Sequence, residues 1–210
     1  MRAMTVVGMV LSSTLLGGCF TSMYVINRAQ TAYLPEASPA LDGLVVKNPQ
    51  PQQQVELVVA FGEHAPIAQV LPAKIHYIAA NCGFKSRSVE GLLQATYPQQ
   101  TLSVTAEKTA PQTQRYRFYQ DLFLPKQDEH GRNCRWGIDR IDLAFASKQV
   151  QAGVPIVIQM ALTKPRFNQG WVQQQYFERT ASLGFFQTWD EAGAHKRPVD
   201  TFAITVRYQP

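Results

Sequence analysis

The 210-residue chain has little cysteine and little charge. It contains three cysteines, and 17% of its residues are charged, against about 25% in an average soluble domain. The basic and acidic residues are dispersed, and no block of five or six like charges occurs. This pattern argues against a nucleic-acid-binding arm, so we expect no nucleic-acid partner.

The sequence also lacks the common catalytic motifs. It has no G-x-S-x-G elbow and no glycine loop of the phosphate- or dinucleotide-binding kind. Glu63-His64 lacks the second histidine of the helical zinc motif, and the four histidines are scattered along the chain. We therefore expect a protein that is not an enzyme and holds no metal and no cofactor, with binding as its leading function.

The first 27 residues carry a single charge, Arg2. The apolar run 5–16 is the length of a signal-peptide core and too short to span a bilayer as a helix. It ends in Leu16-Gly17-Gly18-Cys19. The alternative is an ordinary secretory signal with a chance cysteine.

Leu16-Gly17-Gly18-Cys19 resembles the lipobox of bacterial lipoproteins, in which small residues precede a cysteine that is acylated. The resemblance implies that residues 1–18 are a signal peptide and that lipid is attached to Cys19. Phe20 stands where an aspartate would retain an enterobacterial lipoprotein in the inner membrane. The implied location is the outer membrane, lipid-anchored on the periplasmic side.

The remaining chain is expected to form a tether and one domain. Residues 19–42 contain prolines and small polar residues that break any periodicity, which predicts a lipidated tether. Residues 43–210 suit a single domain. From residue 19 onward there are 19 basic and 15 acidic residues, a net charge of +4 that is compatible with anionic lipid, an acidic partner or a merely soluble surface.

Cys82 and Cys134 remain after Cys19 is assigned to lipid. An even number of cysteines in an oxidising compartment predicts one disulfide. A metal site or a catalytic thiol is the alternative, but no second ligand pair stands at zinc spacing. Trp136 lies two residues after Cys134, on the same expected face.

Apolar residues alternate with polar ones from residue 54 onward, as in half-buried strands. The apolar faces are Val55, Leu57, Val59 and Phe61; Ile75, Tyr77 and Ala79; Leu102, Val104 and Ala106; Tyr116, Phe118, Leu122 and Leu124; Ile141, Leu143 and Phe145; Ile156, Ile158, Met160 and Leu162; and Phe202, Ile204, Val206 and Tyr208. This pattern predicts an all-β antiparallel sandwich of about seven to nine strands with few or no helices.

Two further segments are less regular. Ser86–Ala95 has apolar residues at helical spacing and predicts a short helix. Gln174–Phe186 predicts another strand, with Gly184 as a bend or bulge.

The loop 127–133 is the first candidate contact surface. Asp128, Glu129, His130 and Arg132 stand in a charged hairpin loop beside Cys134. The alternatives are a solvated turn, a metal site and a partner-binding loop. A loop held by a disulfide loses little entropy on binding, which favours a recognition role.

The loop 164–172 is the second candidate surface. It contains Arg166, Phe167 and Trp171 between a proline and a glycine. Arginine and aromatic residues are common anchors of protein interfaces. The alternative is that Phe167 and Trp171 pack under the loop and close one end of the sandwich.

Phe123-Leu124-Pro125, followed by a short loop and Cys134-Arg135-Trp136, is similar to small periplasmic lipoproteins that act as immunity proteins. The resemblance covers about fifteen residues. It implies a protein partner, a toxin such as a lipase delivered by type VI secretion, which the lipoprotein neutralises. The alternatives are a structural outer-membrane lipoprotein of an envelope or secretion assembly, a carrier of a hydrophobic ligand, and an enzyme.

Overall fold

The computed structural model describes residues 34–36, 43–87, 93–163, 167, 169–181, 186, 188–189, 194 and 200–210. About 63% of these residues lie in strands, and the strands of each sheet pair antiparallel. The strands are β1 (Gln54–Phe61), β2 (Ile67–Val70), β3 (Ala73–Ile78), β4 (Phe84–Arg87), β5 (Leu93–Thr96), β6 (Gln99–Val104), β7 (Glu107–Ala110), β8 (Thr113–Tyr119), β9 (Lys126–Gln127), β10 (Asn133–Cys134), β11 (Gly137–Gln151), β12 (Val154–Thr163), β13 (Trp171–Glu178), β14 (Thr188–Trp189) and β15 (Thr201–Gln209).

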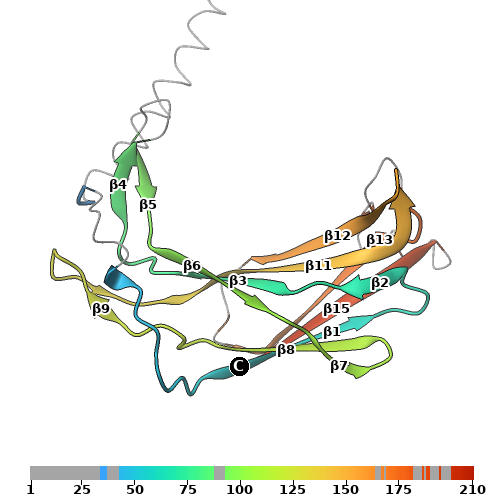
Figure 1. The fold of residues 1–210 in the computed structure, drawn as a ribbon, viewed down its shortest axis with the longest axis horizontal. Helices are drawn as coiled ribbons and strands as arrows, with labels where there is room; N and C mark the ends of the chain where they lie inside the picture. The colour runs from blue at the N-terminus through green and yellow to red at the C-terminus, as the bar shows by residue number, and fades with distance from the viewer. Residues whose placement is uncertain are drawn as a thin grey trace, which may run out of the picture.

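Two main sheets form the layers of the fold (Figure 1). The first has the order β14-β13-β15-β1-β8-β7, and the second has the order β12-β11-β3-β6 with β2 paired to β11. Two small hairpins, β4-β5 and β9-β10, lie together at one end of the molecule (Figure 1). The prediction of an all-β antiparallel sandwich with one disulfide is confirmed.

The alternation of apolar and polar residues in β1 determines which face of the first sheet is buried. Val55, Leu57 and Val59 are at most 1% exposed, while Glu56 points to the outer side and pairs with arginines of β8. β1 lies between β8 and β15, and Leu57 stands opposite Tyr116 on one side and Tyr208 on the other. Successive side chains point to opposite faces of a strand, so one sequence pattern supplies both the core and the charged surface.

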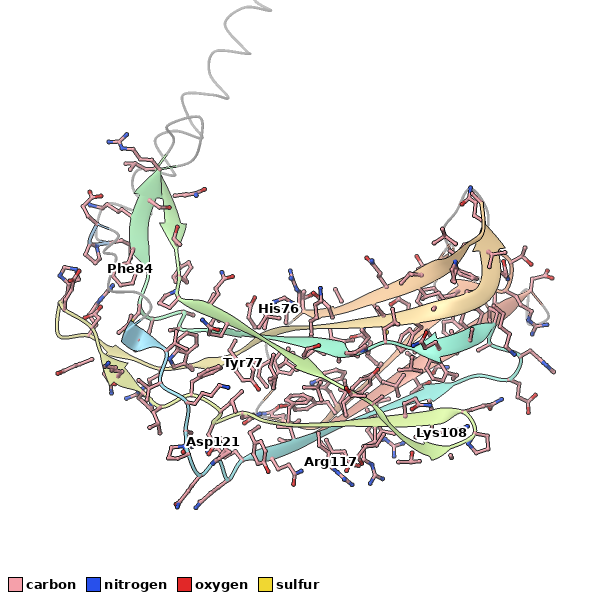
Figure 2. The ribbon with its side chains drawn as sticks, in the orientation of Figure 1. His76, Tyr77, Phe84, Lys108, Arg117 and Asp121 are labelled. Carbon is pink, nitrogen blue, oxygen red and sulfur yellow. A yellow bond between two sulfur atoms is a disulfide. The ribbon has the colours of Figure 1, made fainter. Side chains whose placement is uncertain are left out.

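The second sheet directs its own apolar side chains toward the first sheet. The buried side chains of β3, β11 and β12 join those of β1, β8 and β15 in one core. Phe61 of the first sheet meets Phe145 of the second edge-to-face, with ring centroids 5.1 Å apart. Tyr77 lies between the layers, whereas His76 and Arg117 lie on the two outer sides (Figure 2). Burial raises the pKa values of the Tyr77 and Tyr116 hydroxyls.

The expected strand count was too low, and one predicted element was wrong. The seven alternating segments correspond to β1, β3, β6, β8, β11, β12 and β15, but short strands bring the total among the described residues to 15. The predicted helix Ser86–Ala95 is wrong at both described ends, because Ser86 lies in β4 and Ala95 lies opposite Lys85 in β5; residues 88–92 lie outside the described residues.

The strand predicted through Leu124 ends earlier, at Tyr119. The carboxylate of Asp121 turns the chain by accepting hydrogen bonds from the backbone N–H groups of Gln52 and Gln53, at 2.9 and 3.0 Å. Beyond it, Phe123 makes only an isolated bridge to Lys47. Phe123 is still buried, against Tyr77 and Trp136.

The N-terminal predictions lie mostly outside the described residues. These predictions are the signal peptide, the acylation of Cys19 and most of the tether at 19–42. Within the tether, Leu34 is 6% exposed, and Glu36 forms a bridge with Lys85 of β4. Among the described residues no helix is long and apolar enough to cross a membrane, and the only helical positions are a 3₁₀ turn at 43–44 and Ala194.

Candidate functional site

The end of the molecule that carries the disulfide also carries the first predicted contact loop. Cys82 and Cys134 are bonded, as predicted, with a Cα–Cα distance of 5.4 Å, and both are fully buried. The bond links the turn after β3 to β10, just before β11. It thereby fixes the β9–β10 hairpin, residues 126–134, to the second sheet.

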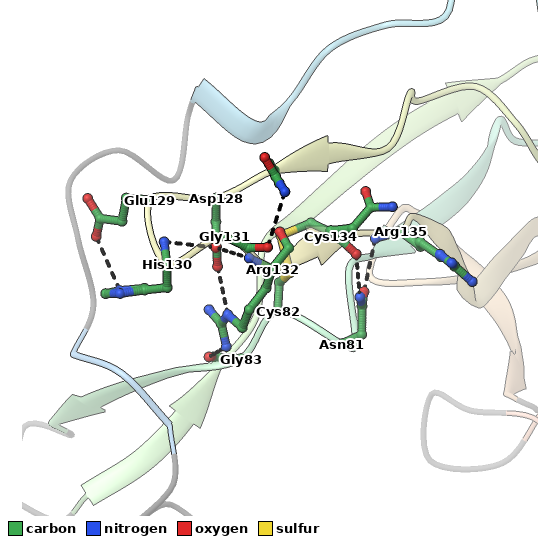
Figure 3. A network of polar contacts seen from close by, with 12 residues as sticks. Asn81, Cys82, Gly83, Asp128, Glu129, His130, Gly131, Arg132, Cys134 and Arg135 are labelled. Carbon is green, nitrogen blue, oxygen red and sulfur yellow. Dashed lines mark hydrogen bonds and ion pairs between the residues drawn. A yellow bond between two sulfur atoms is a disulfide. The ribbon is translucent and has the colours of Figure 1, made fainter.

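The turn of this hairpin is organised by Asp128 (Figure 3). Its Oδ1 accepts hydrogen bonds from the backbone N–H groups of His130 and Arg132, at 3.0 and 2.8 Å. Its Oδ2 accepts a hydrogen bond from Arg132 Nε at 2.7 Å. The Asp128 side chain is 2% exposed, so the charge of a buried carboxylate is balanced within the turn.

The ionisation of Asp128 follows from these contacts. Burial raises the pKa of the carboxyl, but the hydrogen bonds and the positive charge of Arg132, with the His130 backbone bond, outweigh it. The pKa of Asp128 therefore lies below its ordinary value.

Arg132 connects the hairpin to the neighbouring segment. Its Nη1 donates a hydrogen bond to the Gly83 carbonyl oxygen at 2.8 Å, and its guanidinium lies 4.8 Å from the centre of the Phe84 ring. These contacts hold the turn against the residues after Cys82. Glu129 and His130 stay exposed at the tip, 3.5 Å apart.

Among the described residues, one group has the donors for a metal ion, namely Cys82, Cys134 and Asp128, whose ligand atoms lie within 4.8 Å of one another. Both sulfurs are joined in the disulfide, so neither is a thiolate. The Asp128 carboxylate is already bonded to Arg132. The arrangement therefore fits a buried structural cross-link, made of a disulfide beside an ion pair, better than a metal site.

Two hollows of about 660 Å³ each flank the turn at Ala80 and Asn81. One opens toward the hairpin and is lined by Leu34, Pro35, Gly83, Tyr97, His130 and Arg132. The other opens toward the start of β11 and is lined by Ile78, Asn133, Arg135, Trp136, Gly137, Ile138, Asp139 and Phe167. The hairpin tip and the two hollows together form a continuous, irregular end surface.

The residues of the second predicted surface, loop 164–172, do not form one exposed contact surface among the described residues. Arg166 lies outside the described residues. Phe167 is 7% exposed, and Trp171 is the first residue of β13 and stacks on Tyr208 with ring centroids 5.3 Å apart. The Phe167 carbonyl oxygen accepts a hydrogen bond from the Tyr208 hydroxyl at 2.6 Å and another from Gln120. Of the two interpretations, this packing supports the one in which Phe167 and Trp171 close the end of the sandwich.

A polar cluster on the outer face of the second sheet was not singled out from the sequence. His76 Nε2 lies 2.8 Å from Asp142 Oδ2, and Thr101 Oγ1 lies 3.1 Å from His76 Nδ1. Arg140 Nε pairs with Asp142 Oδ1 at 3.0 Å. Strand alternation places each residue on this face, but their meeting depends on the registers of β3, β6 and β11. Nothing in a single strand's sequence specifies those registers.

The His76 cluster has the order of groups found in hydrolase triads but not their setting. A triad needs donors aimed at the developing oxyanion and a site that excludes water. Thr101 is exposed, and His76 lies on the outer face of the sheet, so water reaches the cluster. We therefore regard the end surface around the disulfide as the candidate site.

Comparison of the chain with protein-family models, with curated proteins and with solved structures found no match, so the site rests on its own geometry.

Proposed function

We propose that this protein is a non-enzymatic bacterial envelope lipoprotein, anchored through Cys19, that binds a protein partner with the β9–β10 hairpin. One observation carries the proposal. The hairpin is fixed by the disulfide, by the Asp128 turn and by the Arg132–Gly83 bond, yet Glu129 and His130 at its tip remain exposed.

Such a hairpin has a low entropic cost of binding. Ordering a free side chain or loop costs about 0.5–1.5 kcal/mol for each immobilised side chain. Here the backbone N–H groups of His130 and Arg132 already donate to Asp128, and the Arg132 side chain donates to the Gly83 carbonyl oxygen. A partner would add contacts without having to order the loop.

The specific form of the proposal is an immunity protein that neutralises a secreted toxin, for example a lipase. The signal-peptide and lipobox resemblance of residues 1–19, the absence of catalytic motifs from the sequence and the fixed contact loop support it. Inhibition of this kind requires a rigid projection that covers the mouth of an active site. The hairpin and the two hollows provide a projection beside concave surfaces.

The test is affinity capture with the disulfide-bonded 20–210 form from lysate of its own species, followed by mass spectrometry. The variant Glu129→Ala/His130→Ala changes the exposed tip, and Gln151→Ala changes the tip of the β11–β12 hairpin as the matched control. We expect the wild type and the control to capture one toxin and the tip variant to capture at least tenfold less. Cells that express that toxin should survive only when they also express the wild type or the control variant.

Other outcomes would move the assignment. Capture of envelope or secretion-assembly components, without protection against a toxin, would favour a structural lipoprotein. Equal capture by the tip variant and the wild type would exclude the hairpin as the contact surface.

A further inference from the structure

The first residues that the structure describes, 34–36, are fixed to the disulfide end of the molecule. Leu34 is 6% exposed, and the Pro35 carbonyl oxygen accepts a hydrogen bond from the backbone N–H of Lys85 at 2.6 Å. Glu36 forms a parallel bridge with the same lysine of β4. A chain that reaches the domain from the N-terminal side therefore joins it at the β4–β5 hairpin.

This junction lies beside the tip of the β9–β10 hairpin. Leu34 lines the same hollow as His130 and Arg132. On the other side of the hairpin, Lys126 Nζ of β9 donates a hydrogen bond to the Gly43 carbonyl oxygen at 2.6 Å. An anchor placed before Leu34 is thus attached next to the exposed hairpin tip.

The tip of the β11–β12 hairpin lies at the opposite end of the molecule (Figure 1). β11 begins at Gly137, shortly after Cys134 of the disulfide, and ends at Gln151. Its 15 residues span at most about 45–50 Å. β11 therefore gives the distance from the disulfide end to the far tip.

The chain between the proposed anchor and the domain is short compared with this distance. Cys19 precedes Leu34 by 15 residues, which reach about 50 Å only at full extension. To press the far tip against a bilayer with the disulfide end pointing outward, these residues would have to run almost fully extended along the whole sandwich. Such a path loses nearly all of the conformational entropy of the segment. A less extended path keeps the disulfide end close to the bilayer and lets the far tip swing outward.

From this connectivity we infer that the disulfide end of the anchored protein faces the bilayer and that the β11–β12 tip points away from it. The inference rests on the anchor at Cys19, which is part of the proposed function. It places Glu129 and His130 in the space between the sandwich and the lipid surface. The partner that fits this position is a protein that itself works at the lipid surface.

The orientation is tested by energy transfer from the protein to a vesicle. The disulfide-bonded 19–210 form is coupled through Cys19, the one cysteine outside the Cys82–Cys134 bond. Both sheets and the core lie within residues 34–210. The vesicles consist of phosphatidylcholine with a small share of a maleimide lipid and of a fluorescent acceptor lipid. Phosphatidylcholine has no net charge, so attraction between charged side chains and headgroups does not set the orientation.

Three exposed positions carry the donor dye, one at a time, through azidophenylalanine: Glu129, Gln112 and Gln151. Gln112 is the intermediate position, because its carbonyl oxygen accepts a hydrogen bond from the Phe61 N–H, and Phe61 packs on Phe145 near the middle of β11. We expect energy transfer to decrease in the order Glu129, Gln112, Gln151. A body that swings freely through the outward hemisphere holds its far end higher by half its length on average, which is about 20 Å here.

The matched control is Cys19→Ser with the donor at Glu129. It cannot be coupled to the maleimide lipid, and we expect no energy transfer above background. Equal transfer from Glu129 and Gln151 in the coupled protein, or stronger transfer from Gln151, would overturn the inference. Transfer from the Cys19→Ser control as strong as from the coupled protein would show adsorption instead of orientation by the anchor, and would overturn it as well.

The result is independent of whether the cell acylates Cys19, because the lipid is attached chemically. Mass spectrometry of the protein from envelopes of its own species tests the acylation, and the capture experiment tests the protein partner. Failure of the orientation and failure of the proposed function are therefore distinguishable.

Discussion

The Asp128 carboxylate is a buried anion with three hydrogen-bond donors, and two of them come from Arg132. Its side chain is 2% exposed while that of Arg132 is 28% exposed, so water still solvates part of the cation. The energy of the pair should therefore lie between that of a surface salt bridge and that of a fully buried one.

Replacement of Asp128 by Asn tests this energy. Asn keeps an acceptor for one backbone N–H but removes the charge opposite Arg132 Nε, which should lower the free energy of unfolding by about 1–3 kcal/mol. Urea unfolding at pH 7 measures the change. The control Glu129→Gln alters the exposed neighbour and should stay within about 0.5 kcal/mol of the wild type.

The lowered pKa of Asp128 also predicts an acid sensitivity. The folded state holds this proton less tightly than the unfolded chain, whose aspartates have a pKa of about 3.9. The contribution of Asp128 to stability is therefore complete above that value and is lost as the pH falls through the lower pKa of the folded state. Unfolding free energies measured from pH 6 to pH 2.5 should fall less steeply for Asp128→Asn than for the wild type; identical slopes would contradict the assignment.

Residue identity alone did not distinguish contact residues from packing residues. Phe167 lies in a proline- and glycine-marked loop, where an aromatic residue suits both roles. Its burial depends on Tyr208 and Gln120, which are 41 and 47 residues away in sequence. Such distant partners leave no trace in the local pattern. Asp128 and Arg132 stood out as charged residues of one loop, but their inward pairing with each other was not predictable from the sequence.

At the scale of single elements, the β11–β12 hairpin has a specific turn. Ala152 and Gly153 both have positive φ values, 49° and 80°, at the tip between the two strands. This left-handed backbone matches the twist of a two-residue hairpin and favours Asn-Gly. Alanine at the first position carries a steric cost that the sequence does not avoid.

Two substitutions at this tip should shift stability in opposite directions. Ala152→Asn should raise the free energy of unfolding by about 0.5–1 kcal/mol, because Asn tolerates the left-handed region better than Ala. Gly153→Ala should lower it by about 1–2 kcal/mol, although nothing lies within 4 Å of the added Cβ. Thermal unfolding of both variants measures the effects. A loss of stability in Ala152→Asn would show that the turn is not strained.

Elements with a long alternating pattern were predictable, and short ones were not. β1, β11 and β15 bury one face against a large core, so apolar and polar residues alternate over most of their length. β4 and β5 have four residues each, and their pairing depends on partners rather than on pattern. For the same reason the apolar spacing in Ser86–Ala95 predicts a helix where Ser86 and Ala95 lie in strands.

At the scale of the whole molecule, the disulfide joins two positions separated by 52 residues. In the chain-entropy account, closing a loop of this length restricts the unfolded chain by about 4 kcal/mol. The double variant Cys82→Ala/Cys134→Ala should therefore lose about that much stability, measured by urea unfolding under oxidising conditions. The wild type in reductant should show a similar loss, and no change in either case would mean that the bond only positions the hairpin.

The order of strands in the first sheet has a consequence for when the protein folds. β15 lies between β13 and β1, and its Gln209 stands opposite Glu56 of β1, which is far away in the sequence. When the ribosome has synthesised β1 through β13, the two strands that flank β15 in the sheet are present, but β15 itself is not. β1 and β13 lack the strand that lies between them until residues 201–209 have been synthesised. Contacts between residues so far apart in sequence form slowly. The first sheet is thus completed only after β15 has been synthesised, so its β1–β15 and β13–β15 ladders form after synthesis of the strands on both sides.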